Sequence, residues 1–379
     1  MDHARKMEAQ EEAYRPNGVP KAIKVIGGKA MQHTQIPKKE LQALEFSYPD
    51  GSMHSQISSL LSSLRYVGIP VTKSWLFGTS CLSFLFRIDD AVNLAPELHE
   101  LPHRRMYDLV QNVGVQIDGV SGYAEGQRYS DLLAEAWQVA RKAMDAGQPC
   151  ISRGIQFGLN ETALVYGYNG DGYFSDCWRN RGQFTRWDRL GEGLSLSAPS
   201  LKESNEKRPY GYVDLHRLKP DPSKAVDDAT VVREVFELAV GFAAEPARWV
   251  RPTTKTGAQA LQVLANAMSA SKVDGWLFSW SAGMWHECFN HGRLFLLEAR
   301  DRLNMDASTA FQQAIGSYDT LTNLFERIVE LYPFPTAEGL IGESEQRGEA
   351  IHILQDAMPI MDQSLEALDS IARALRNTR

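Results

Sequence analysis

Apolar side chains recur with helical spacing in the first part of the chain. The first stripe has the i, i+3, i+4, i+7 pattern of an amphipathic helix and consists of Ile57, Leu60, Leu61 and Leu64. We expect a helix over residues 55–66, ended by Gly68 and Pro70, because both residue types terminate helices. A similar stripe predicts a second helix over residues 130–144, before the turn-forming sequence at 145–149.

Three strand-like runs follow the second helix. They cover residues 150–157, 162–168 and 173–178, each bounded by turn-forming residues. Asn-Gly-Asp-Gly at 169–172 joins the last two runs and is typical of the tight turn of a β-hairpin. A further short strand is expected over residues 22–26. A helix early and an antiparallel sheet late predict an α+β fold class.

Two long segments near the end of the chain keep a helical apolar period. One stripe extends from Phe311 to Ile328, and the other extends from Leu354 to Leu375. Stripes of this length are typical of helices that pack together along their apolar faces. They predict an all-α, antiparallel helical bundle.

Glycine and proline divide the chain into two parts. Residues 1–224 contain 20 of the 29 glycines and 12 of the 17 prolines, so the first part turns far more often. We expect a flexible arm over residues 1–20, an α+β domain over 21–218 and the helical domain over 225–379. The proline-bearing linker lies at 218–224.

Composition and charge narrow the classes of function. Of the 379 residues, 43% are hydrophobic and 23% are charged, as in globular proteins with a buried core. The net charge is −7, whereas nucleic-acid-binding proteins carry a basic surplus. Neither a signal peptide nor a run of 18 apolar residues is recognisable. We expect a cytoplasmic protein that binds neither nucleic acid nor membranes.

The cysteines argue against a metal or disulfide scaffold. They are far apart, without C-x-x-C spacing, and are Cys81, Cys150, Cys177 and Cys288. In a chain of this size they are expected to be reduced and mostly buried. The sequence 286–291 resembles the zinc motif H-E-x-x-H but lacks its second histidine at i+4. We therefore expect no metal ion and no cofactor.

A series of short motifs lies between residues 46 and 191. In order they are Ser55-x-x-x-x-Leu-x-x-x-Leu-x-x-x-Gly68, Trp75-Leu-Phe-Gly78, Gly147-Gln-Pro149, Glu161-Thr-Ala-Leu-Val-Tyr-Gly167-Tyr168 and Tyr173-Phe-Ser-Asp176. This series resembles the papain-like cysteine peptidases that remove leader peptides. It is more similar still to the N-terminal domain of the butirosin biosynthesis protein H family, which are acyltransferases. The resemblance implies a papain-like domain followed by an all-α extension.

The resemblance also implies a catalytic triad, in which two positions are substituted. Ser55 stands where the family has cysteine, Glu161 stands where it has histidine, and only the acidic Asp176 is retained. A catalytic thiolate is stabilised by a neighbouring imidazolium, whereas a carboxylate beside serine supplies no positive charge. This set of residues is therefore unable to follow the papain mechanism.

Strand arithmetic predicts a different use for the two carboxyl groups. A two-residue turn at 170–171 places Val165 opposite Asp176, so that Glu161 and Asp176 share a face of the sheet. Two neighbouring carboxyls raise one pKa and provide a general acid or base. The alternative is that each carboxylate is bound by backbone or arginine groups.

Other polar and aromatic residues are candidates for substrate binding. They are His54, Gln56, Cys81, Arg153, Trp280, His291 and Arg293. His54 adjoins Ser55, but adjacent residues of a helix do not face each other. The tryptophan-rich segment 276–293 either caps an interdomain cleft or forms a helix interface.

Two functional hypotheses remain open at this stage. In the first, the protein transfers an acyl or aminoacyl group in natural-product biosynthesis, with a small-molecule substrate and an acyl carrier protein as donor. In the second, it is a catalytically inactive relative that binds a small molecule or a partner. A homodimer through the helical domain also remains open.

Overall fold

The computed structural model describes residues 38–42, 52–92, 94, 102–155, 161–177, 182–192 and 209–377. Residues 37–379 form one compact unit. The expected arm at 1–20 and the expected strand at 22–26 lie outside the described residues. No helix among the described residues is long and apolar enough to cross a membrane.

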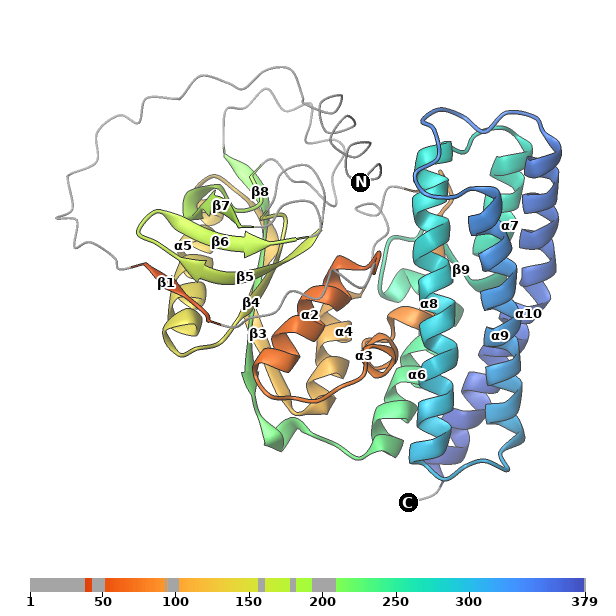
Figure 1. Ribbon diagram of the computed structural model, residues 1–379, viewed down its shortest axis with the longest axis horizontal. Coiled ribbons are helices and arrows are strands. Elements are labelled where there is room, and N and C mark those ends of the chain that lie inside the picture. The colour runs from red at the N-terminus through yellow and green to blue at the C-terminus, as the bar shows by residue number, and fades with distance from the viewer. Residues whose placement is uncertain are drawn as a thin grey trace, which may run out of the picture. The chain divides into compact units, whose positions relative to one another are not determined.

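An antiparallel sheet forms the first part of this unit (Figure 1). Its strands lie in the order β3–β8–β4–β5–β6–β7, and β1 pairs with β5. Their bounds are β1 Lys39–Glu40, β3 Val115–Glu125, β4 Cys150–Arg153, β5 Thr162–Tyr168, β6 Gly172–Asp176, β7 Gln183–Arg186 and β8 Tyr210–Pro220. The expected hairpin is β5 and β6, and the helix and sheet confirm the α+β class in this part.

The sequence pattern does not predict the long pair β3 and β8, which are hydrogen-bonded along their whole length. Glycine interrupts the apolar alternation of β3. The close pairing with β8 nevertheless requires glycine at position 119, because a larger side chain does not fit there. A Cβ atom on Gly119 would lie 2.0 Å from the carbonyl oxygen of Leu215. The strand β8 also takes in the first residues of the expected linker, and Leu218 is fully buried.

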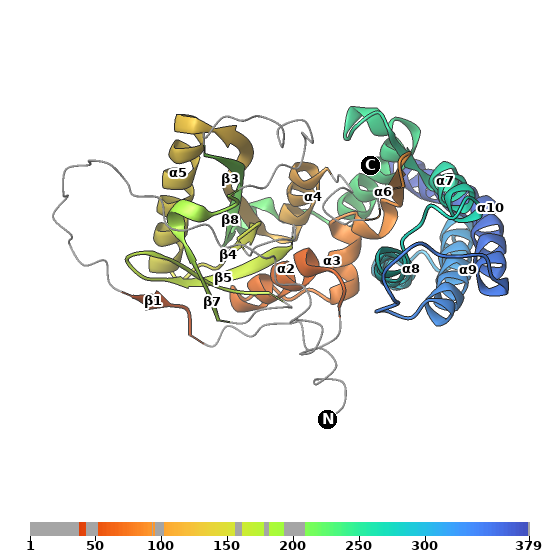
Figure 2. The ribbon, with the colours of Figure 1, turned by 90° about the horizontal axis from the view of Figure 1, so that it is seen from above.

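Helices cover both faces of the sheet (Figure 2). The helix α5, Gly126–Asp145, packs on β3 and β8, while α2, Ser55–Tyr66, packs on β4 and β5. The observed α2 has the bounds expected from the sequence, and α5 begins one turn earlier than expected. Shorter helices α3, Lys73–Thr79, and α4, His103–Val110, lie on the α2 side.

The C-terminal part is helical, as the apolar stripes predict. Its helices are α6 Asp228–Ala244, α7 Gly257–Ser269, α8 Gly275–Arg302, α9 Thr309–Leu331 and α10 Glu345–Arg376. In four of them the residue before the helix caps it, because its side-chain oxygen accepts a hydrogen bond from a first-turn backbone N–H. These capping residues are Asp227, Asp274, Ser308 and Ser344. These caps fix where each helix starts. The helical C-terminal part agrees with the expected all-α domain.

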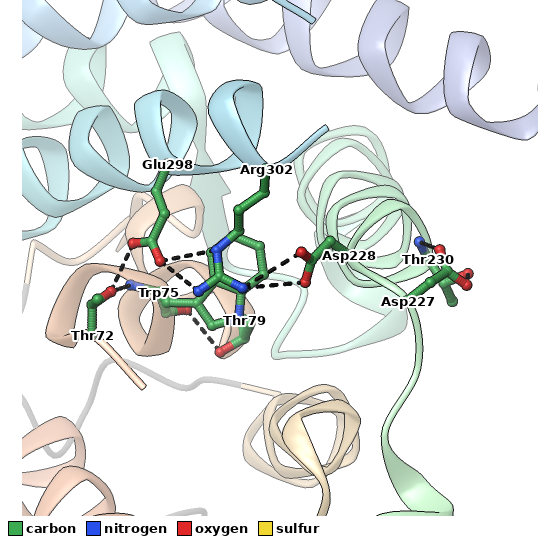
Figure 3. Close-up of polar contacts among 8 residues, drawn as sticks. All are labelled: Thr72, Trp75, Thr79, Asp227, Asp228, Thr230, Glu298 and Arg302. Atoms are coloured by element: carbon green, nitrogen blue, oxygen red, sulfur yellow. Dashed lines mark hydrogen bonds and ion pairs between the residues drawn. The ribbon is translucent and has the colours of Figure 1, made fainter. Parts of the chain in front are cut away.

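Contacts join the sheet part to the helical part. The strand β2, Arg87–Asp89, pairs with β9, Thr254–Thr256, and one apolar core extends from α2 to α10. Figure 3 shows an ionic network that ties α3, α6 and α8 together around Arg302. Its guanidinium lies 2.7 Å from Glu298, 3.3 Å from Asp228 and 3.9 Å from the centre of the Trp75 ring.

Candidate functional site

A cleft of about 110 Å³ opens where the N-terminus of α2, the start of β5 and the middle of α8 meet. One wall is apolar and aromatic, and includes Phe86, Trp280, Met284, Trp285 and Phe289. The remaining lining is polar and charged, and includes His54, Ser55, Gln56, Arg87, His103, Arg153, Glu161, Thr162 and Cys288. The cleft therefore combines an apolar surface with several groups that bind or react with polar ligands.

Serine side chains hold α2 against the start of β5. The hydroxyl of Ser55 accepts a hydrogen bond from the Thr162 N–H at 3.0 Å, and Ser59 donates to the Thr162 carbonyl at 3.1 Å. Ser55 is thus buried at the position where the resemblance implies the nucleophile. The structure shows no hydrogen bond from Ser55 to a basic side chain among the described residues.

The predicted pairing of Glu161 with Asp176 is wrong. A β-bulge between Val165 and Gly167 shifts the register, so that Leu164, not Val165, lies opposite Asp176. A one-residue shift moves a side chain to the other face of the sheet. Glu161 lines the cleft, whereas Asp176 lies outside its lining and accepts a hydrogen bond from the Gly182 N–H at 2.5 Å.

A thiol and an imidazole meet in the cleft instead. The Sγ atom of Cys288, on α8, lies 3.3 Å from Nε2 of His54, the residue that precedes α2. His54 Nε2 also lies 3.1 Å from the carbonyl oxygen of Met284. A carbonyl only accepts hydrogen bonds, so this contact assigns the proton to Nε2. His54 is therefore a donor toward both the carbonyl and the sulfur.

Burial keeps this pair neutral in the resting protein. The exposed fractions of His54 and Cys288 are 7% and 9%. Burial lowers the pKa of His54, with the Glu287 carboxylate acting in the opposite direction. Burial also raises the pKa of the Cys288 thiol; Glu287 adds to this rise, while the Arg87 guanidinium opposes it. A thiolate at Cys288 thus needs help from a ligand or from high pH.

Glu287 completes the surroundings of the pair. Burial acts to raise its pKa, but His54, Lys73 and the Met53 N–H outweigh that effect and hold it below its usual value. Its oxygens contact the Lys73 ammonium at 3.1 Å and the Met53 N–H at 2.8 Å. Glu287 is therefore an anion that fixes the segment leading into His54.

Arg153 lies at the end of β4, directly across from Thr162 on β5. Its side chain is buried and lines the cleft, with Nε 3.8 Å from an oxygen of Asp214. The other oxygen of Asp214 lies 2.9 Å from His216 Nε2. The position of Arg153 brings a positive charge next to the N-terminus of α2.

Three predicted binding residues lie outside the cleft lining. Cys81 is fully buried, with its thiol 3.4 Å from the Val235 carbonyl. The imidazole of His291 is 2.9 Å from the Ser74 hydroxyl and stacks on a phenylalanine ring. Arg293 contacts Asp319 at 3.7 Å. His54, Gln56, Arg153 and Trp280 do line the cleft.

Sequence reasoning missed Cys288 and Arg87 as residues of the site. Cys288 lies in the segment 286–291, which resembles a zinc motif but lacks its second histidine. His54 is 234 residues away in the chain, so no local sequence pattern predicts their contact. Arg87 is in the short strand β2, which the sequence pattern does not predict. Across the described part of the chain, no group of three or more His, Cys, Asp or Glu is arranged to hold a metal ion.

No protein-family model matches the chain. No curated protein is similar to it in sequence.

Proposed function

We propose that the protein transfers acyl groups in the cleft and that Cys288, rather than Ser55, is the nucleophile. The observation that carries this proposal is the 3.3 Å contact between the Cys288 sulfur and His54 Nε2. The two groups supply the thiol and imidazole that the Ser55 and Glu161 positions lack. The papain-like assignment is part of the proposal, supported by a helix whose N-terminus abuts the first residue of a β-hairpin.

The reaction needs an acyl thioester as donor and an amine as acceptor. The Cys288 sulfur attacks the donor carbonyl, a new carbon–sulfur bond forms, and the donor thiol leaves with the proton of Cys288. The amine then attacks the acyl-cysteine, so that an amide bond forms and the Cys288 thiol is restored. Neither of these two steps requires an oxidant, a reductant or a metal ion.

His54 has a defined part in this scheme. Its one Nε2 proton is shared between the Met284 carbonyl and the sulfur, so it stabilises negative charge on the thiolate, as charge-assisted hydrogen bonds do. The Arg87 guanidinium adds a positive charge that favours the thiolate. The apolar wall at Phe86, Trp285 and Phe289 gives an acyl chain a surface to pack on.

Ligand binding without chemistry is the second candidate function. It is favoured by the burial that raises the pKa of Cys288 and lowers the pKa of His54, because both groups are then neutral and unreactive. Under this alternative the cleft holds a ligand, and the thiol is only part of its wall.

Intact-mass spectrometry distinguishes the two functions. We expect the protein, incubated with butyryl-N-acetylcysteamine thioester, to gain one butyryl group that neutral hydroxylamine removes. Ser55→Ala and the matched control Cys81→Ser retain the adduct, whereas Cys288→Ala loses it. An adduct that persists in Cys288→Ala refutes the assigned nucleophile. Absence of any adduct on the unaltered protein at pH 7–9 favours binding alone.

A further inference from the structure

We infer that the cleft binds the carboxylate of a small organic acid at Arg153, beside the N-terminus of α2. This inference takes the cleft as the substrate site, as proposed above, and adds the chemical class of one substrate. It rests on three features of the lining: a buried arginine side chain without a hydrogen bond to another described residue, a helix N-terminus without a side-chain cap, and an imidazole nitrogen without a partner among the described residues.

The guanidinium of Arg153 is the first feature. The side chain is 5% exposed, and its one ion pair with a described residue is the 3.8 Å approach to Asp214, which is longer than a hydrogen bond. It also lies over the ring of Tyr212, 5.4 Å from the ring centre. No hydrogen bond joins the guanidinium to another described residue, so its donors are available to a ligand in the cleft. A ligand carboxylate accepts two such donors side by side.

The N-terminus of α2 is the second feature. Its capping residue, His54, makes no side-chain capping bond, and its first turn contains no acidic residue. The first N–H groups of a helix and the positive end of its dipole favour an anion. Ser55 of this turn is bonded to Thr162, and Thr162 pairs across the sheet with Arg153. The helix end and the guanidinium are therefore neighbours.

The third feature is His103, at the start of α4. Its Nδ1 atom is buried without a hydrogen-bond partner among the described residues, and the side chain lines the same cleft. Burial, together with the charges of Arg153 and Arg87, lowers its pKa, so the ring is neutral and has one donor. Together with Arg153 and the N-terminus of α2, the N–H of His103 completes a set of donors for the oxygen atoms of a carboxylate.

The charged side chains in the lining favour an anion. Among the described lining residues, Arg87 and Arg153 are positive and Glu161 is negative, whereas Asp214 does not line the cleft. The aromatic residues of the same lining suit an apolar body. A monocarboxylic acid with an aromatic or aliphatic body fits these charges better than inorganic phosphate, which lacks that body.

Calorimetric titration of the full chain tests the carboxylate site. Phenylacetate is the probe, phenylacetamide is its neutral counterpart of the same shape, and inorganic phosphate is the third arm. We expect phenylacetate to bind at least tenfold more tightly than either of the others. Equal binding of phenylacetate and phenylacetamide overturns the inference, as does tighter binding of phosphate or no binding of phenylacetate.

Variants locate the site. We expect Arg153→Met to lose at least tenfold in affinity for phenylacetate, while Arg217→Met, a control on the neighbouring strand β8, keeps it. Unchanged binding by a folded Arg153→Met overturns the inference; if that variant does not fold, the phenylacetate and phenylacetamide comparison on the unaltered chain decides. The titrations contain no acyl donor, so a failure of acyl transfer does not affect them.

Discussion

Gly78 sets how closely α3 packs on α8, the helix that carries Cys288. A Cβ atom at this position would lie 2.0 Å from Cδ2 of Phe295, whereas ordinary contact begins at 3.4 Å. The ring and the new methyl group must therefore separate by about 1.4 Å, the difference between these distances. Phe295 is fully buried and packs against the ring of Trp75 at 4.9 Å. It has little room to move.

We expect Gly78→Ala to destabilise the protein. Overpacking of a core costs about 1–3 kcal/mol, and the better helix propensity of alanine offsets up to about 1 kcal/mol of this. Because the overlap of about 1.4 Å is large, we expect a cost near the upper end of this range, so that the net loss is roughly 2 kcal/mol in the free energy of unfolding.

The assay is urea unfolding followed by circular dichroism, with Gly316→Ala as the matched control. Gly316 is also helical, and a Cβ atom there meets nothing within 4 Å. The control should gain up to about 1 kcal/mol. In the double variant Gly78→Ala/Phe295→Leu, the smaller leucine side chain should recover part of the stability that Gly78→Ala loses. If Gly78→Ala gains stability as the control does, the close packing of α3 on α8 is wrong.

Three further predictions concern the thiol, a cap and the ionic network. Because burial raises the pKa of Cys288, its alkylation by iodoacetamide should still accelerate above about pH 10.5, where an ordinary thiol has levelled off; a plateau by about pH 10.5, measured by mass spectrometry, contradicts the burial argument. Asp274→Ala should cost about 1–2 kcal/mol in denaturant unfolding, because its oxygens accept the N–H groups of Leu277 and Gly339; an unchanged midpoint refutes the cap. Arg302→Met should cost about 1 kcal/mol or less, since the network is partly exposed, and a double-mutant cycle with Asp228→Asn should show coupling that salt weakens. No coupling in that cycle means that the pair contributes nothing to stability.

Local patterns in the sequence predict the elements of this fold well. The stripe from Ile57 to Leu64 and the breaker Gly68 give the bounds of α2, and the turn at 169–172 gives the β5–β6 hairpin. In both cases the deciding forces act between residues close in the chain. The long pair β3 and β8 is not predictable in this way, because its glycines are explained only by the partner strand.

The candidate site depends on contacts that local patterns do not contain. One extra residue in a bulge reverses the face of Glu161 relative to Asp176, and no turn signal marks that bulge. The contact between His54 and Cys288 joins α2 to α8 across most of the chain. Six of the predicted residues line the cleft, namely His54, Ser55, Gln56, Arg153, Glu161 and Trp280. Which residues they contact there depends on how α8 packs on the sheet part.

Peptide mapping of the acylated protein is the most direct test of the central claim that Cys288 accepts the acyl group. Trypsin cleaves after Lys272 and Arg293, so Cys288 is released in the peptide 273–293, and Ser55 is released in the separate peptide 40–65. After incubation with butyryl-N-acetylcysteamine thioester, we predict one butyryl group on peptide 273–293, at Cys288. A butyryl group on Ser55, with none at Cys288, contradicts the account.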